Sequence, residues 1–443
     1  MAGLIPDFGN IALTVAAFVV ALSIIVAVHE YGHYIVGRWC GIHAEVFSLG
    51  FGPRLFSRVD SRGTRWQLAA LPFGGYVKFM GDSDAASRPD GAALQGLSAD
   101  EARHTMQGAP LWARAATVAA GPLFNFALSI LIFSGFLWVS GIARDEAVVG
   151  EVMAVPGAEA LQPGDAILAL DGQPVADLAA FYAVARSLPP AASTQFLINR
   201  GGTELEVTGP YPFPPLVSGV QPMTPAAESG MQDGDFVTSV NGTPVLAFDQ
   251  MREIVGNSNG APVTLGILRR DETLEITITP RRTDLPKPEG GFETRWMVGL
   301  GGGPAILPAL RTPGPIEGVS IAAAQVWGVI TTSLSGLWHM AAGNISTCNL
   351  QGPLGIAETS GAAASLGAES FILFIATLST AVGLMNLFPI PVLDGGHLLF
   401  HAWEAVTRRK PSDRVVQGLM TAGLAVLLAL MAFGLSNDTV LCP

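Results

Sequence analysis

A His-Glu-x-x-His motif, His29 to His33, directly follows an uncharged and mostly apolar run from Ile11 to Val28. Such a run is expected to be helical in a bilayer, because hydrocarbon offers no water to satisfy an open backbone. Histidines four residues apart lie on one helical face and can bind one Zn²⁺ ion, while Glu30 can take a proton from a metal-bound water. Ionisable groups are costly at this depth, so the motif predicts a hydrolytic metal site inside a membrane.

The rest of the chain has the composition of a membrane protein with several spans. Of its 443 residues, 49% are hydrophobic and 14% are charged, which is too apolar for an ordinary soluble protein. Four segments reach the roughly 20 residues that a spanning helix needs: Ile11–Val36, Ala115–Val139, Phe371–Leu393 and Val415–Leu435. The first ten residues contain no Lys or Arg, so we expect a retained first helix rather than a cleaved signal peptide.

Basic side chains predict the orientation of these helices. They gather in two loops, at Arg38, Arg54, Arg58, Arg62, Arg65, Lys78, Arg88, Arg103 and Arg114, and at Arg408, Arg409, Lys410 and Arg414. Because such loops stay in the cytoplasm, both termini and the stretch from Gly141 to Ser370 are expected outside. Gly141 to Pro313 holds 20 acidic and 11 basic residues, which argues against nucleic acid as a partner.

The three cysteines allow at most one disulfide within the chain. Under this topology Cys40 faces the cytoplasm, whereas Cys348 and Cys442 lie outside, in a compartment that permits oxidation. A bridge between Cys348 and Cys442 and two unrelated free thiols are both compatible with the sequence.

The external stretch from Val148 to Arg282 contains two copies of one unit. Five residues recur at a constant offset of 70, namely Gly164, Asp165, Gly172, Pro174 and Val175 as Gly234, Asp235, Gly242, Pro244 and Val245. Gly164–Val175 and Gly234–Val245 resemble the core motif of tandem PDZ domains. That resemblance implies binding of an extended peptide at a sheet edge. The alternative is that the repeats act only as gates or spacers.

Asp394 is the expected third metal ligand, because a catalytic zinc usually has three protein ligands and one open position. It ends the third apolar segment, where Pro389 and Pro391 should unwind the helix and Gly395 and Gly396 allow close backbone approach. The uncharged stretch Ser320–Gly343 has polar residues near one helical face, which predicts an interfacial helix. If that stretch crossed the membrane, Asp394 and His29 would lie on opposite sides of a core ~30 Å thick.

These features together resemble the site-2 protease family of intramembrane zinc metalloproteases. Four further segments carry the resemblance: Phe47–Pro53, Leu71–Lys78, Ala120–Phe126 and Gly352–Ala357. It implies one Zn²⁺ per chain on His29, His33 and Asp394, with Glu30 as catalytic base and acid. The implied activity is hydrolysis of a peptide bond within the transmembrane segment of a single-span membrane protein. An anti-sigma factor already cut by a site-1 protease, in an envelope stress response, is the typical substrate, and signal-peptide remnants are a second class.

The resemblance also implies residues that handle the substrate. The stretch Phe47–Met80 should form a hairpin that re-enters the membrane and adds a substrate strand; an ordinary cytoplasmic hairpin is the alternative. The substrate-binding residues expected there are Gly50, Phe51, Gly52, Gly74, Gly75 and Tyr76. In the third apolar segment they are Asn386, Pro389 and Pro391. The Asn386 amide would bond either the unwound backbone or a substrate carbonyl or oxyanion.

Other polar residues near these motifs receive no catalytic role. His397 and His401 are expected to be bystanders in a basic cytoplasmic loop, and His43 and His104 are expected to be solvated. Asn125 either caps a helix contact or lines the site.

The fold expected is a polytopic α-helical membrane protein with four transmembrane helices, a membrane-associated β-hairpin and two inserted periplasmic PDZ-like α+β domains, in a bacterial inner membrane. Its parts are transmembrane helices (1–40, 114–140, 368–400 and 413–436), the hairpin and its loop (41–113), the PDZ-like domains (145–212 and 213–283), a linker with the interfacial helix (284–367), a cytoplasmic loop (401–412) and a periplasmic tail (437–443).

Two rival classes stay open. One is a membrane-anchored zinc protease with its site in a soluble domain, and the other is a non-catalytic PDZ scaffold that regulates a protease. The first places His-Glu-x-x-His on a polar helix, and the second has no need of a base beside paired histidines.

Overall fold

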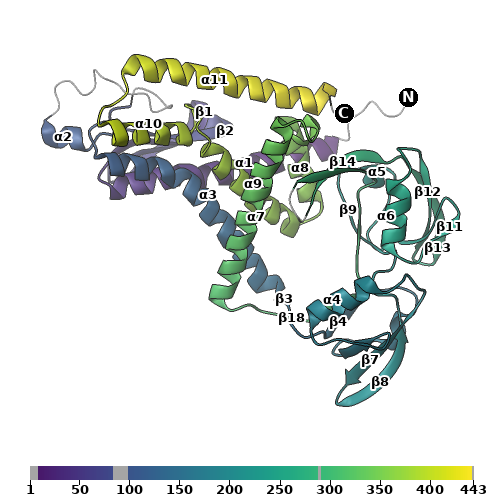
Figure 1. The fold of residues 1–443 in the computed structure, drawn as a ribbon. Coiled ribbons are helices and arrows are strands. Elements are labelled where there is room, and N and C mark those ends of the chain that lie inside the picture. The colour runs from purple at the N-terminus through teal and green to yellow at the C-terminus, as the bar shows by residue number, and fades with distance from the viewer. Residues whose placement is uncertain (1–7, 83–97, 288–290, 442–443) are drawn as a thin grey trace. The chain divides into compact units, whose positions relative to one another are not determined.

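The computed structural model describes residues 8–82, 98–287 and 291–441, and these form two compact units (Figure 1). Unit 1 comprises Met1–Gly135, Ile316–Met340 and Ser346–Pro443, and unit 2 comprises Phe136–Pro315 and Ala341–Ile345. The polar site predicted above falls in unit 1, and the sequence repeat falls in unit 2.

Five helices among the described residues are long and apolar enough to cross a membrane: α1 (Phe8–Trp39), α3 (Leu111–Ser140), α7 (Pro315–Ala341), α9 (Ala368–Asn386) and α11 (Asp413–Ser436). Four match the predicted spans, and the fifth, α7, covers the stretch expected to be interfacial. Length and composition do not distinguish a crossing helix from an interfacial one, so the count of four spans stays a prediction. The shorter helices of unit 1 are α2 (Ala99–Arg103), α8 (Pro353–Ser365) and α10 (Asp394–Thr407).

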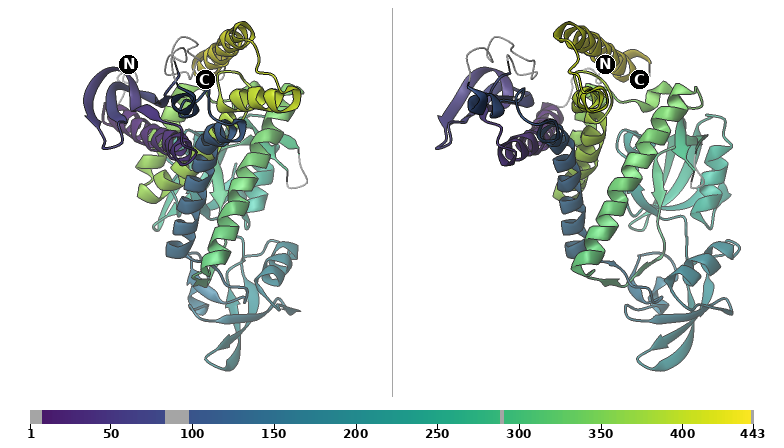
Figure 2. Two further views of the ribbon diagram at one scale, coloured as in Figure 1. Left: turned by 90° about the vertical axis from the view of Figure 1, so that its left-hand side faces the viewer. Right: turned by 60° about the vertical axis from the view of Figure 1, so that its left-hand side comes forward.

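The predicted hairpin is present as β1 (Ala44–Val59) and β2 (Arg65–Phe79), an antiparallel pair that lies beside α1 (Figure 2). Both strands bend sharply, so Phe47 pairs with both Trp66 and Val77, whereas Phe56 pairs with Leu68. The bends coincide with glycines of positive φ, Gly50, Gly52 and Gly74. As a result, residues 46–49 lie between 65–68 and 75–78. Within the described residues, 75–79 pair with β1 along one edge and with no strand along the other.

Unit 2 confirms the internal repeat, because its two halves have the same strand order. The first half forms the sheet β6-β5-β7-β8 with helix α4, and the second forms β11-β10-β12-β13 with helix α6. The bounds in the first are β5 (Ala166–Leu170), β6 (Gln173–Pro174), α4 (Leu178–Ser187), β7 (Thr194–Arg200) and β8 (Thr203–Gly209). In the second they are β10 (Phe236–Val240), β11 (Thr243–Pro244), α6 (Phe248–Gly256), β12 (Val263–Arg269) and β13 (Glu272–Ile278).

After the second repeat, three short strands pair with strands that lie earlier in unit 2. Strand β16 (Leu300–Gly302) pairs with β9 (Val217–Val220), β17 (Ile306–Pro308) pairs with β4 (Val149–Val152), and β18 (Leu310–Arg311) pairs with β3 (Ile142–Ala143). The remaining elements are the hairpin β14 (Arg281–Pro286) and β15 (Phe292–Met297), the helix α5 (Pro225–Glu228), and the short helical turns Ala158–Ala160, Thr347–Asn349 and Asn437–Leu441. One returning segment therefore completes both repeats.

The repeated Gly-Asp pair has a structural explanation. Asp165 is 1% exposed, and its carboxylate accepts hydrogen bonds from the Arg200 guanidinium at 2.7 Å and from the backbone of Gln162 at 2.8 Å. Asp235 makes the same contacts with Arg269 and Gln232. The aspartate thus ties the loop before each sheet to the end of a central strand, which is why it recurs.

The cysteines are described only in part. Cys40 is free and Cys348 is disulfide-bonded, while Cys442 lies outside the described residues. The predicted pairing of Cys348 with Cys442 therefore stays a prediction.

We expect Asp165→Asn to destabilise the first repeat by about 2 kcal/mol at neutral pH, because charge-assisted hydrogen bonds to Arg200 are lost. The hydrogen bond from Arg200 holds the pKa of Asp165 below its usual range. The difference from the unsubstituted chain should therefore be full above pH about 4 and disappear as pH falls through that lowered pKa. Hydrogen exchange of β5 and β7 amides in the full chain measures it. Asp171→Asn, an exposed change in the same repeat, is the control; equal exchange in both variants would contradict the expectation.

Candidate active site

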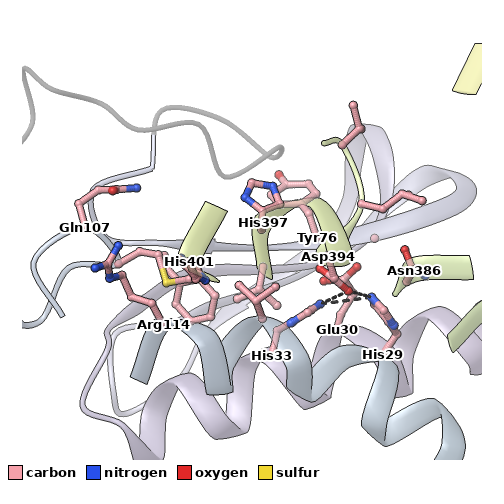
Figure 3. Close-up of a pocket in the computed structure, with 17 residues that line it drawn as sticks. His29, Glu30, His33, Tyr76, Gln107, Arg114, Asn386, Asp394, His397 and His401 are labelled. Atoms are coloured by element: carbon pink, nitrogen blue, oxygen red, sulfur yellow. Dashed lines mark hydrogen bonds and ion pairs between the residues drawn. The ribbon is translucent and has the colours of Figure 1, made fainter. Parts of the chain in front are cut away.

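Three predicted ligands from two distant parts of unit 1 meet at one point (Figure 3). His29 and His33 project from α1, and Asp394 is the first residue of α10. The distance from Asp394 Oδ2 is 3.1 Å to His29 Nε2 and 3.4 Å to His33 Nε2, and the two Nε2 atoms are 3.2 Å apart. The sequence separation of more than 360 residues between the histidines and the aspartate is thus closed by the fold.

These distances fit a bound zinc ion. Four ligand atoms at the ~2.0–2.1 Å typical of zinc, in a tetrahedron, lie about 3.3 Å from one another. The three atoms here form a triangle of nearly that size, and they are the group of potential metal ligands found among the described residues. Asp394 Oδ2 is buried and makes no conventional hydrogen bond. A cation at the centre of the triangle would satisfy all three atoms.

The outer nitrogens of both imidazoles have partners on α3. His33 Nδ1 lies 2.9 Å from the carbonyl oxygen of Thr117, to which it can donate. His29 Nδ1 lies 3.2 Å from the side-chain nitrogen of Asn125, which is fully buried and whose oxygen has no partner in that orientation. A histidine that binds metal through Nε2 carries its hydrogen on Nδ1, so rotation of the Asn125 amide would let the oxygen accept it. Both rings would then present Nε2 to one ion.

Two glycines let α1 and α3 approach closely enough for this arrangement. A Cβ atom on Gly121 would lie 2.3 Å from His33 Nε2, and one on Gly32 would lie 2.6 Å from the carbonyl oxygen of Ala120. A side chain at Gly32 would push the helices apart, and one at Gly121 would displace the imidazole rings. Sequence reasoning did not assign Gly121 to the site, although its place four residues before Asn125 in an apolar helix was an available signal.

Glu30 lies against strand β2. A Cβ atom on Gly75 would be 3.1 Å from Glu30 Cγ and 2.8 Å from Val26 Cγ1, so the strand reaches the helix because this residue is glycine. Glu30, Gly75 and Tyr76 line the same pocket as His29, His33 and Asp394. Glu30 and residues 75–76 of β2 therefore face the same cavity.

The other predicted hairpin residues act at a distance from the pocket. Phe51 stacks on Tyr76 with ring centroids 6.0 Å apart, and Gly74 lies against Phe51. Gly50 and Gly52 are bends in β1 that contact Leu71. Only Gly75 and Tyr76 of the six line the pocket itself.

The third apolar segment unwinds where the prolines predict. Helix α9 ends at Asn386, and α10 begins at Asp394. Gly395 packs against the carbonyl oxygen of Leu387, and Gly396 packs against that of Ile390, so the second helix folds back on the loop. Asn386 lines the pocket and donates one hydrogen bond to Val382 of its own helix. Pro389 and Pro391 do not line the pocket, and Pro391 contacts Gly423 of α11; their predicted role in substrate binding stays a prediction.

Two histidines expected in a cytoplasmic loop lie elsewhere. Helix α10 continues to Thr407, so much of the predicted loop 401–412 is helical. His397 and His401 lie on this helix and line the same pocket (Figure 3). The structure thus differs from the expected loop in conformation, because the two glycines after Asp394 start a new helix that turns back to the site; the cytoplasmic location of these histidines stays a prediction.

We expect Asn125→Ala to raise the Kd for zinc by about 10–100-fold, the usual effect of losing a partner of a ligating histidine. Asn125→Asp should bind zinc at least as well as the unsubstituted chain, because a carboxylate also accepts from His29 Nδ1. Competition with a chromophoric chelator measures both. Ser134→Ala, a buried change on the same helix, serves as the control. An unchanged Kd in Asn125→Ala would show that the amide does not orient His29.

Comparison with known proteins agrees with this geometry. The sequence profile of Peptidase family M50 matches residues 17–430. The chain is 36% identical over 431 residues to the "Putative zinc metalloprotease R01501" of Rhizobium meliloti, covering 97% of each chain. It is 31% identical over 463 residues to the "Regulator of sigma-E protease RseP" of Salmonella typhimurium, covering 97% of this chain and 99% of that one.

A solved PDZ domain of an SdrC-like protein from Listeria monocytogenes is also similar, with 17% identity, a TM-score of 0.16, and coverage of 20% of this chain and 84% of that one. The repeat in unit 2 rests on its own sequence and strand order. The match to the family along nearly the whole chain shows that this protein belongs to peptidase family M50, the site-2 protease family, and is a zinc metalloprotease of the membrane.

Proposed function

We propose that this protein hydrolyses a peptide bond within the transmembrane segment of a single-span membrane protein. His29, His33 and Asp394 hold one Zn²⁺ per chain, and Glu30 is the catalytic base and acid. The observation that carries the proposal is the triangle of 3.1, 3.2 and 3.4 Å between the three ligand atoms, built on an apolar helix and on the start of α10.

The chemistry divides between the ion and the side chains. When bound, Zn²⁺ supplies a Lewis acid that polarises the scissile carbonyl and lowers the pKa of a coordinated water from roughly 15.7 to about 7. Glu30 takes a proton from the attacking water and then gives it to the leaving amine. Glu30 lies against Gly75 and lines the same pocket as His29, which supports this role because the base and the proposed substrate strand then face one cavity.

Strand β2 gives a means of presenting the substrate. A helix hides its peptide bonds, so the scissile segment must be extended before water can attack. Residues 75–79 pair with β1 on one side, and an extended substrate can add to the other side by main-chain hydrogen bonds. Asn386, which lines the same pocket, has a second side-chain N–H that can donate to a substrate carbonyl or oxyanion. Gly50, Phe51, Gly52 and Gly74 would shape the strand, and Pro389 and Pro391 the loop opposite.

The site also supports the four-span topology. His29 and His33 lie in the C-terminal half of α1, and Asp394 follows the C-terminal end of α9. The two ends must reach the same side of the bilayer, and α3 crosses in the opposite direction. An extra crossing by α7 would place them on opposite sides. We therefore propose that α7 does not cross, that both termini and the PDZ-like repeats are periplasmic, and that the site lies near the cytoplasmic face of a bacterial inner membrane.

We propose that the substrate is an anti-sigma factor already cut once outside the membrane. The name of the Salmonella relative, which refers to regulation of sigma-E, supports a role in sigma-factor regulation. Signal-peptide remnants are a second candidate class. The PDZ-like repeats would bind a peptide or a substrate terminus, or act as a size filter.

Co-expression tests the reaction. Single-span proteins lacking their external domains should be shortened by the unsubstituted chain and remain intact with Glu30→Gln, which keeps the metal and loses the base. Asp394→Ala should also be inactive, and it should lose zinc as well, measured by metal content. Glu369→Gln, at an exposed glutamate in the first turn of α9, is the matched control. Cleavage at the normal rate by Glu30→Gln would show that the assignment of the base is wrong.

Cysteine labelling tests the topology. Single cysteines at Gly314 and Ala342, at the two ends of α7, should both react with an impermeant maleimide added outside spheroplasts. A cysteine at Arg409 should react only after lysis. Protection of the Ala342 position until lysis would mean that α7 crosses and that the four-span proposal is wrong.

A further inference from the structure

Helix α10 presents four ionisable side chains on one face. Asp394, His397, His401 and Glu404 follow one another at spacings of three, four and three residues, which places them along one side of the helix. The first three line the pocket, as does Arg114 of α3 (Figure 3). The fourth, Glu404, pairs with Arg114. The polar face of α10 therefore runs from the proposed metal site to a buried ion pair.

The ion pair between Arg114 and Glu404 is bidentate. Arg114 Nη1 donates to Glu404 Oε2 at 3.0 Å, and Nη2 donates to Oε1 at 2.7 Å. Arg114 is 6% exposed, and its Nε donates to the carbonyl oxygen of Ala109 at 3.1 Å. A planar guanidinium held at three points defines the direction of its partner as well as the distance. This contact fixes the far end of α10 against the first turn of α3.

The same face of α3 contacts both proposed metal-binding histidines. Thr117, Gly121 and Asn125 follow Arg114 by three, seven and eleven residues, a helical spacing that places them in one row. Thr117 bonds His33, Asn125 contacts His29, and Gly121 lies against both rings. One row of α3 therefore orients the two histidines and also holds the helix that begins with Asp394.

Apolar packing of α10 against the rest of the described chain is slight. Its fully buried residues are Gly395 and Gly396, both at its start, and Leu398 is partly buried against the core cluster that contains Tyr34 and Phe79. Leu399, Trp403 and Val406 on its outer side are 53%, 58% and 84% exposed within the described chain. The polar contacts of Asp394 and Glu404, near the two ends of the helix, therefore contribute much of what sets its position.

We propose that Arg114 and Glu404 are positioning residues whose ion pair sets α10 against α3, and so holds Asp394 at the distance from His29 and His33 that binds zinc. This inference rests on the proposed zinc site. It assigns these two residues no contact with substrate, and it predicts that metal affinity depends on a contact about 15 Å along the helix from Asp394.

The test measures the Kd for zinc in the Glu30→Gln background, where no turnover occurs, on full-length protein that elutes folded in detergent. The double variant Arg114→Met with Glu404→Met should raise the Kd about 10–100-fold. Replacing a buried ion pair with apolar side chains is often neutral for folding, so the fold should persist. Arg114→Lys keeps the charge and loses the bidentate hydrogen bonds to Glu404, and it should also raise the Kd for zinc at least threefold. Arg409→Met, an exposed cation removed just after α10, should leave the Kd unchanged.

A merely structural pair would change the yield of folded protein and leave the zinc affinity of the folded fraction as it was. A folded double variant with the unsubstituted Kd would therefore overturn the inference. If the double variant does not fold, Arg114→Lys with an unchanged Kd overturns it instead. Failure of the proposed zinc site gives a different result. In that case the Glu30→Gln parent would bind no zinc, or would bind zinc equally well after Asp394→Ala.

Discussion

The structure depends on bringing a carboxylate and two imidazoles together among the apolar helices of unit 1. Each of these groups alone is costly to bury, and the cost falls when the carboxylate lies beside the two imidazoles. Asp394 reaches His29 and His33 across most of the chain length, at 3.1 and 3.4 Å. The glycines around the site and the break between α9 and α10 make that meeting possible.

Close approach of backbone segments at glycines brings these three side chains together. Gly121 and Gly32 let α1 and α3 touch, Gly75 lets β2 reach Glu30, and Gly395 with Gly396 folds α10 back on its own loop. A side chain at most of these positions would overlap backbone or ring atoms, so the glycines are steric requirements. The apolar helices supply rigidity around these points, because interiors packed at protein density transmit small displacements. The glycines therefore contribute to the position of the site as much as the polar side chains do.

Local patterns in the sequence predicted much of this. The apolar runs, the 70-residue repeat, the break at Pro389 and Pro391, and the pairing of His29 and His33 with Asp394 could all be read from spacing and residue type, with the family resemblance adding the activity. One difference is also informative. His397 and His401 were expected in a basic cytoplasmic loop, because nothing local shows that α10 continues to Thr407 and turns toward the pocket.

The sequence by itself determined which segments are helical and apolar, which residues can bind a metal, and that unit 2 is a repeat, because these follow from composition and from periods of a few residues. Only the tertiary structure decided that Asn125 contacts His29, that Gly121 accommodates both rings, and that Arg114 pairs with Glu404. Contacts between residues far apart in the sequence, here 96 positions for Asn125 and His29 and 290 for Arg114 and Glu404, depend on how helices cross and rotate against each other. The spacing of residue types along the sequence does not reveal how the helices pack.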